Sequence, residues 1–151
     1  RGRQFVVIVI LKGALVFTAD LLRRMPIPLE IECINVASYH GATQSSGQVD
    51  FLDTKLPGVE GRAVLLIDDI LDTGRTLDAV GEKLREQGAE IVKSCVLLSK
   101  DKERAAKVEA DYVGFHVGDE FVRGYGLDYK GLYRNLPYVG VLKAEVVEAG
   151  E

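Results

Sequence analysis

Residues 64–77 read VLLIDDILDTGRTL, and this stretch decides the fold. An apolar run, Ala63 to Ile67, leads directly into two carboxylates, Asp68 and Asp69. A short, wholly apolar run of this kind is typical of a strand that is buried on both faces in a parallel sheet. A third carboxylate, Asp72, precedes the polar residues with which a helix is expected to begin. The stretch therefore predicts a strand, an acidic turn and a helix in direct succession.

The two halves of this turn suit different ligand groups. Asp68 and Asp69, when ionised, are acceptors that suit ribose hydroxyls or a magnesium ion. The second half offers backbone N–H groups at a helix N-terminus, two hydroxyls and a guanidinium, which together suit a phosphate monoester. A sugar phosphate would satisfy both halves. The residues of the second half are Asp72, Thr73, Gly74, Arg75 and Thr76.

A plainer alternative is that the aspartates only solubilise the strand end and cap the helix. Against it, three carboxylates within five residues of a buried strand are unfavourable unless a cation or hydroxyls share their charge. The sequence contains neither G-x-x-x-x-G-K-[ST] nor G-x-G-x-x-G. Nucleoside triphosphatases of the P-loop type and dinucleotide-binding enzymes are therefore excluded.

Similar apolar runs on either side of the acidic turn predict further strands at 5–11, 29–37 and 91–99. A helix is expected at 14–25, and another after the turn, where Gly88 would cap its C-terminus. The resulting order predicts an α/β fold, with a mostly parallel twisted sheet flanked by helices. Ligands of such sheets bind beyond the carboxyl ends of the strands. We therefore expect the chemistry to follow Leu11, Ile67 and Leu98.

Two segments lack a regular pattern. Residues 38–48, rich in Gly, Ser, Thr and Gln, predict a long mobile loop. Residues 111–138, rich in Tyr, Phe and Gly, predict irregular structure with short strands, which would cap the site.

Composition narrows the class of protein. The length of 151 residues, 47% of them hydrophobic, predicts a single domain over 1–151. The formal net charge of −4 gives no overall attraction to nucleic acid or to an anionic membrane. Cys33 and Cys95 lie in apolar stretches without C-x-x-C spacing, so we expect buried free thiols and a cytoplasmic location. Because the sequence starts at Arg1, we expect that an N-terminal stretch of the natural chain is missing.

The acidic turn resembles the phosphoribosyl pyrophosphate (PRPP) signature of phosphoribosyltransferases, and nearly the whole chain resembles their hypoxanthine-guanine branch. The resemblance implies a type I phosphoribosyltransferase fold, with a small hood formed largely by the C-terminal part. It also implies a Mg²⁺-dependent purine-salvage reaction that uses PRPP and hypoxanthine or guanine, in a homodimer or homotetramer. Beside the turn, the segments that carry the resemblance are Leu11 to Ala14, Ser38-Tyr39, Lys100, Asp119 to Tyr129, and Arg134 to Tyr138.

The resemblance also implies roles for particular residues. Asp72 would be the general base beside N7 of the purine, and the loop at Lys12 would contain a cis peptide bond. PRPP and its phosphates would contact Lys12, Gly13, Asp68, Asp69, Asp72, Thr73, Gly74, Arg75, Thr76 and Arg134. The purine would contact Ile70, Lys100, Phe121, Val122 and Asp128, with Lys100 donating to O6. Magnesium would be held by Asp68, Asp69 and Asp128, and Ser38 and Tyr39 would begin a flexible loop over the substrates.

Each role has a structural alternative. Asp72 could be a simple helix cap, Lys100 one charge of an exposed run, and Phe121 a core residue. Two rival functions also remain open at this point: a PRPP-binding regulator that binds RNA or DNA, and a sugar-phosphate hydrolase. The absence of a basic stripe disfavours the first, and the absence of an Asp-x-Asp nucleophile pair disfavours the second. His40 and His116 have no ligand partners at metal spacing, so we expect neither to be catalytic.

Overall fold

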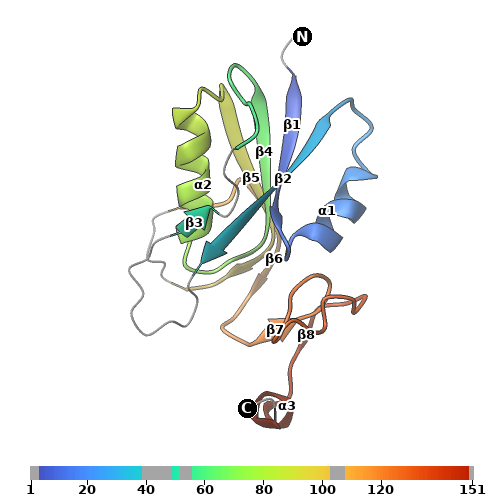
Figure 1. Ribbon diagram of the computed structural model, residues 1–151. Helices are drawn as coiled ribbons and strands as arrows, with labels where there is room; N and C mark the ends of the chain where they lie inside the picture. Colours follow the sequence, from blue (N-terminus) through green and yellow to red (C-terminus); the bar gives the residue numbers. More distant parts are fainter. Residues whose placement is uncertain (1–3, 39–48, 52–55, 103–107, 150–151) are drawn as a thin grey trace.

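A six-stranded sheet forms the centre of the protein (Figure 1). The computed structural model describes residues 4–38, 49–51, 56–102 and 108–149. The strand order is β3-β2-β1-β4-β5-β6, and all neighbours pair in parallel except β2 and β3. The predicted mostly parallel α/β sheet is therefore confirmed. The strands are β1 (Phe5–Leu11), β2 (Glu30–Ser38), β3 (Val49–Phe51), β4 (Ala63–Leu71), β5 (Ile91–Lys100) and β6 (Tyr112–Val117).

Two helices cover opposite faces of the sheet (Figure 1). Helix α2 (Arg75–Glu86) packs its buried residues Leu77, Val80 and Leu84 on one face of β1 and β4. Helix α1 (Leu15–Leu22) covers the other face, where Phe17 packs against the cluster of Val7, Val9 and Ile67. Because both faces are covered, β1 is apolar along its whole length and β4 is apolar from Ala63 to Ile67, which explains these unbroken apolar runs.

The strand order reverses at the centre of the sheet. Helix α1 leads from β1 to its neighbour β2 on one side, and α2 leads from β4 to β5 on the other. Both crossovers are expected to be right-handed, and this places the two helices on opposite faces. The carboxyl ends of β1 and β4 therefore diverge into different loops, which leaves a crevice suited to a ligand.

A small second sheet lies beyond the carboxyl ends of the main strands (Figure 1). It consists of β7 (Val122–Arg123) and β8 (Gly140–Val141), and helix α3 (Ala144–Ala149) follows. Val122 and Leu127 pack on Leu97 and Leu98 of β5, which attaches this C-terminal unit to the main sheet. We call residues 121–141 the hood, as the resemblance implied.

Strand β4 is longer than predicted. The sequence suggested that it stops at Ile67, but it continues to Leu71 and includes Asp68 and Asp69. The added residues pair with β5, for example Ile70 with Leu98. Backbone groups make this pairing, so a polar side chain does not end the strand when the neighbouring strand continues alongside.

Other differences concern the edges of the fold. Residues 112–117, expected in the irregular cap, form β6 and extend the main sheet, while β3 was not predicted. Helix α1 is shorter than the predicted 14–25. Ser38 ends β2, and the rest of the predicted loop at 38–48 lies outside the described residues. Among the described helices, none is long and apolar enough to cross a membrane.

The two cysteines are both free, but only Cys95 is buried. Cys33 is exposed, contrary to the prediction. It shares one face of β2 with Ile31, which is 55% exposed, because alternate residues of a strand point to the same side. The apolar pattern of β2 therefore predicted a strand correctly but overestimated how much of it is covered.

Gly88 caps α2 as predicted. Its φ is +94°, its N–H donates to the carbonyl of Arg85 at 3.0 Å, and the N–H of Ala89 donates to that of Leu84 at 3.1 Å. This is the Schellman arrangement, in which a left-handed residue lets the chain leave the helix while its last carbonyls stay bonded. A Cβ at this position would also lie 3.1 Å from Cγ of Glu60.

We predict that Gly88→Ala lowers the free energy of unfolding by about 1–2 kcal/mol, the cost of a side chain in the left-handed region. Urea unfolding followed by circular dichroism measures this. Gly58→Ala is the matched control, because a Cβ there meets nothing within 4 Å and the φ of Gly58 is not in the left-handed range. Equal stability of the two variants would contradict the role of Gly88.

Candidate active site

A cavity of about 600 Å³ lies between the carboxyl ends of β1, β4 and β5 and the hood. Its volume is within the range of about 300–1,000 Å³ that is usual for small-molecule sites. The predicted site residues that line it are Gly13, Asp68, Asp69, Ile70, Asp72, Thr73, Gly74, Thr76, Lys100, Phe121, Asp128 and Arg134. Residues from four separate parts of the sequence, at 13, 68–76, 100 and 121–134, thus meet at one place.

The remaining predicted residues are placed differently. Lys12 is exposed, and neither Lys12 nor Arg75 is among the lining residues. The side chain of Val122 is buried in the hood, so only its backbone could read a base edge. Tyr39 and the side chain of Ser38 lie outside what the structure describes.

The acidic pair stands on the cavity side of β4. Asp68 is only 9% exposed, and one of its carboxylate oxygens accepts the N–H of Asp69 at 2.8 Å. Burial raises the pKa of Asp68 well above its usual range, and the negative charge of Asp69 raises it further. A ligand that brings a cation or hydroxyl groups would stabilise the charged pair.

The loop after β1 lies directly against Asp69. A Cβ on Gly13 would be only 1.9 Å from Oδ2 of Asp69, so a larger residue here would displace the Asp69 carboxylate. The Leu11–Lys12 peptide bond is cis, as the resemblance implied. On the hood side, a Cβ on Gly126 would be 2.3 Å from the carbonyl oxygen of Gly13. The loop is therefore held between β4 and the hood.

The phosphate half of the turn has the local structure that its sequence predicts. Gly74 has a φ of +84° and precedes the first residue of α2. The hydroxyl of Thr73 accepts the N–H of Arg75 at 3.3 Å. The N-terminus of α2, with its partial positive charge, therefore faces the cavity beside the hydroxyls of Thr73 and Thr76. An anionic group is the ligand that this arrangement favours.

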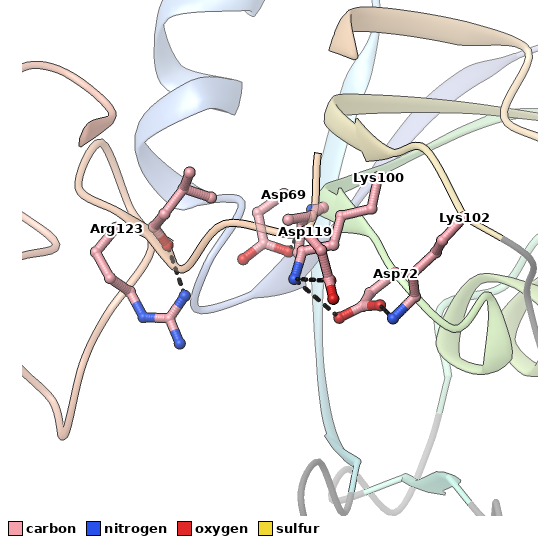
Figure 2. Close-up of polar contacts among 8 residues, drawn as sticks. Asp69, Asp72, Lys100, Lys102, Asp119 and Arg123 are labelled. Atoms are coloured by element: carbon pink, nitrogen blue, oxygen red, sulfur yellow. Dashed lines mark hydrogen bonds and ion pairs between the residues drawn. The ribbon is translucent and has the colours of Figure 1, made fainter. Parts of the chain in front are cut away.

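Asp72 lies between two lysines at the far side of the cavity (Figure 2). Nζ of Lys100 is 3.6 Å from one of its carboxylate oxygens, and Nζ of Lys102 is 2.5 Å from the other. Lys100 also lies 3.5 Å from Oδ1 of Asp119. The side chain of Lys100 is 14% exposed, so it is not one charge of a solvated run. The two ammonium groups hold the Asp72 carboxylate in position.

Lys102 was not among the predicted site residues. It follows the end of β5 by two residues, in a bend where its N–H donates to the carbonyl of Lys100 at 3.1 Å. This spacing from Lys100 was the available signal in the sequence.

The hood supplies an aromatic surface. Phe121 is 37% exposed and contacts Tyr129 edge-on, with 5.5 Å between the ring centroids. Arg123, which also lines the cavity, places its guanidinium carbon 3.6 Å from the centroid of the Phe121 ring. Neither Tyr129 nor Arg123 was given a role from the sequence. Their contacts support Phe121 as a cavity residue and not as part of the core.

Arg134 forms a hydrogen bond and an ion pair with other residues of the hood. Its guanidinium donates to the carbonyl of Gly126 at 2.7 Å, and the N–H of Gly126 donates to the carbonyl of Arg134 at 2.8 Å. A second nitrogen is 3.5 Å from Oδ1 of Asp128. The other oxygen of Asp128 accepts the N–H of Gly131 at 2.8 Å. These contacts keep both side chains at the cavity edge.

The predicted magnesium ligands do not form a closed metal site. Asp68, Asp69 and Asp128 all line the cavity, yet among the described residues no three acidic, histidine or cysteine side chains are grouped closely enough to hold an ion. Magnesium commonly takes only one or two carboxylates and completes its shell with waters and substrate phosphates. The residues fit an ion that arrives with a phosphorylated substrate.

The cavity therefore joins two kinds of recognition. Carboxylates and a helix N-terminus suit a sugar phosphate, whereas the lysine-bound Asp72 and the ring of Phe121 suit a planar polar base. A molecule or pair of molecules with both parts would fill it.

Comparisons with known proteins agree with this chemistry. Residues 1–130 match the family model for the phosphoribosyl transferase domain. A hypoxanthine-guanine phosphoribosyltransferase of Staphylococcus epidermidis is 47% identical over 146 residues, which are 97% of this chain and 82% of the relative. The protein of the same name from Staphylococcus aureus is 45% identical with the same coverage.

Solved structures give the same result. The crystal structure of a hypoxanthine phosphoribosyltransferase from Staphylococcus aureus is similar with a TM-score of 0.89 at 45% identity, over 97% of this chain and 79% of that one. A variant of the Trypanosoma cruzi hypoxanthine phosphoribosyltransferase, complexed with the product IMP, has a TM-score of 0.90 at 38% identity, over 99% of this chain and 77% of that one. The chain therefore belongs to the phosphoribosyltransferase family, in its hypoxanthine-guanine branch.

Proposed function

We propose that this chain transfers the 5-phosphoribosyl group of PRPP to hypoxanthine or guanine, giving IMP or GMP and pyrophosphate. The observation that supports this most is the shared cavity, in which the acidic turn and the Asp72–Lys100 pair face one ligand space. The family that the comparisons identify is one of purine-salvage enzymes. The two parts of the cavity correspond to the two substrates.

The reaction is a displacement at C1 of the ribose. A bond forms between N9 of the purine and C1, the bond between C1 and the pyrophosphate oxygen breaks, and pyrophosphate leaves with the electron pair. The purine loses its N7 proton to Asp72, which acts as general base. Lys100 donates to O6, and because an ammonium has no acceptor it disfavours the 6-amino group of adenine.

Asp68, Asp69 and Asp128 would hold magnesium together with oxygens of PRPP. The ion would supply positive charge where the pyrophosphate leaves. The N-terminus of α2 and the hydroxyls of Thr73 and Thr76 would bind the 5-phosphate, at the opposite end of the same substrate.

The rival functions predict different features. A PRPP-binding regulator would need the phosphate turn but no positioned base, whereas here Lys100 and Lys102 both contact Asp72. A sugar-phosphate hydrolase would not need the exposed ring of Phe121. Nucleotide formation from a free base separates both rivals from the transferase.

We further propose that residues 1–151 act as one domain within a cytoplasmic homodimer or homotetramer, without nucleic-acid or membrane partners. The exposed side chains of Tyr112 and Phe115 on the edge strand β6 support assembly, because apolar groups at an unpaired edge favour contact with another chain. The free thiols of Cys33 and Cys95 support a reducing compartment.

We predict that Asp72→Asn lowers kcat by about 10²- to 10⁴-fold, the usual contribution of a positioned base. Nucleotide formation from hypoxanthine and guanine is the measurement, and an unchanged melting temperature shows that the variant is folded. Asp101→Asn is the matched control, because Asp101 is 67% exposed and does not line the cavity. Full activity of Asp72→Asn would exclude its role as base.

We predict that Lys100→Met lowers kcat/KM for hypoxanthine by about ten- to a hundredfold, the value of one hydrogen bond to a charged group. The activity with adenine relative to hypoxanthine should rise. Lys93→Met tests the same change on the same strand, at a side chain that is 56% exposed and outside the cavity. An equal loss in both variants would show that the effect is structural.

We predict that removal of divalent cations with EDTA abolishes nucleotide formation and that added Mg²⁺ restores it. Asp69→Asn should need a higher Mg²⁺ concentration for half-maximal rate, because one charged ligand is lost. Asp78→Asn is the control, since Asp78 is exposed in the first turn of α2 and does not line the cavity. A rate that does not respond to EDTA would contradict the magnesium proposal.

A further inference from the structure

Arg123 lines the cavity from the hood, beside the aromatic surface. Residues 121 and 123 are alternate positions of an extended segment, so their side chains leave it on the same side. Both line the cavity, whereas the intervening Val122 is 5% exposed and faces the hood core. Arg123 and Phe121 therefore face the same ligand.

The guanidinium of Arg123 is held in two ways. It lies over the ring of Phe121, with 3.6 Å between its central carbon and the ring centroid. One nitrogen, Nη1, donates to the carbonyl oxygen of Val122 at 2.5 Å (Figure 2). The hydrogen bond to Val122 joins adjacent residues, so it can persist while the guanidinium moves relative to the Phe121 ring.

One donor of this guanidinium is not satisfied. Nε of Arg123 is buried and has no hydrogen-bond partner in the described part of the chain. A buried donor without an acceptor costs about 1–3 kcal/mol, so an acceptor is expected from a ligand. Burial lowers the pKa of Arg123, whereas Asp128 and Asp69 raise it, and an arginine remains charged at neutral pH.

The orientation of the base decides which of its atoms meets Arg123. This step rests on the proposed function, in which N7 faces Asp72 and O6 faces Lys100. Around a purine ring the C2 position lies beyond O6, on the edge away from N7. In Figure 2, Arg123 lies at the opposite end from Asp72 and Lys102, with Asp69 between them. The C2 edge of the base is therefore the part that points toward Arg123.

We propose that Arg123 is a specificity-determining residue that reads the substituent at C2 of a 6-oxopurine. A planar base takes the place of the guanidinium on Phe121, and the bond to Val122 keeps the guanidinium at the edge of the base. There its N–H groups oppose the 2-amino group of guanine, which is also a donor. They match the 2-oxo group of xanthine, an acceptor, and are neutral toward hypoxanthine, which carries only hydrogen at C2.

The test is the ratio of kcat/KM values for guanine, xanthine and hypoxanthine in the wild type and in Arg123→Leu. We expect the guanine-to-hypoxanthine ratio to rise about tenfold and the xanthine-to-hypoxanthine ratio to fall by a similar factor, as for one charged hydrogen bond. The KM for PRPP should stay unchanged. Dissociation constants of IMP and GMP, measured by calorimetry, give the same ratio without turnover.

Lys130→Leu is the matched control. Lys130 is a second hood cation that lines the cavity, with its ammonium 5.5 Å from the centroid of Tyr129. Its replacement removes a positive charge from the same unit but should leave the guanine-to-hypoxanthine ratio as in the wild type. A shared change in both variants would assign the effect to net charge and overturn the proposal.

Other outcomes are equally decisive. Ratios that stay the same in Arg123→Leu, in a folded protein that turns over hypoxanthine, would overturn the role of Arg123 and leave the proposed function intact. A raised KM for PRPP with constant base ratios would place Arg123 on the phosphate side and also overturn it. A wild-type protein that forms no nucleotide from any base would instead refute the proposed function.

Discussion

The parallel pairing of β1 with β4 is the constraint on which the site depends. Their register, with Val9 opposite Ile67, brings the loop after β1 to the position where β4 presents its carboxylates. Gly13 then lies so close to Asp69 that a Cβ would be 1.9 Å from Oδ2. Because both strands are buried on both faces, neither can shift along the other without exposing apolar residues or breaking the crossovers to α1 and α2. The contact between the Gly13 loop and Asp69 therefore depends on the two most buried strands of the protein.

Charge is distributed unevenly around this centre. Asp68 and Asp69 are adjacent, and burial together with mutual repulsion raises the pKa of Asp68. Asp72, only a few residues further along, contacts Lys100 and Lys102 and so has its countercharge within the protein. The same short stretch therefore contains carboxylates that need a ligand or ion and one that is already neutralised by neighbours. That difference agrees with a phosphorylated, metal-bound substrate at one end and a base at the other.

Sequence patterns predicted most of the sheet and of the acidic turn, for identifiable reasons. An unbroken apolar run needs burial on both faces, so β1 matched its predicted bounds, and Gly88 matched because a helix end needs a left-handed residue. Predictions failed where a neighbour decides the outcome. Strand β4 extends past its aspartates because β5 continues beside it, and Cys33 is exposed because nothing in the described part of the chain covers that face of β2.

By itself, the sequence determined the fold class, the acidic turn and the family resemblance, since these follow from local periodicity and from contiguous residues. Only the tertiary structure decided which distant side chains meet. Lys102 contacts Asp72 across the gap between β5 and the turn, and Arg123 of the hood lines the same cavity as Asp69 and Asp72. Such contacts depend on how the hood packs against β5 and on rotamers that residue order does not encode, because distances between elements are set by the packing of the whole core.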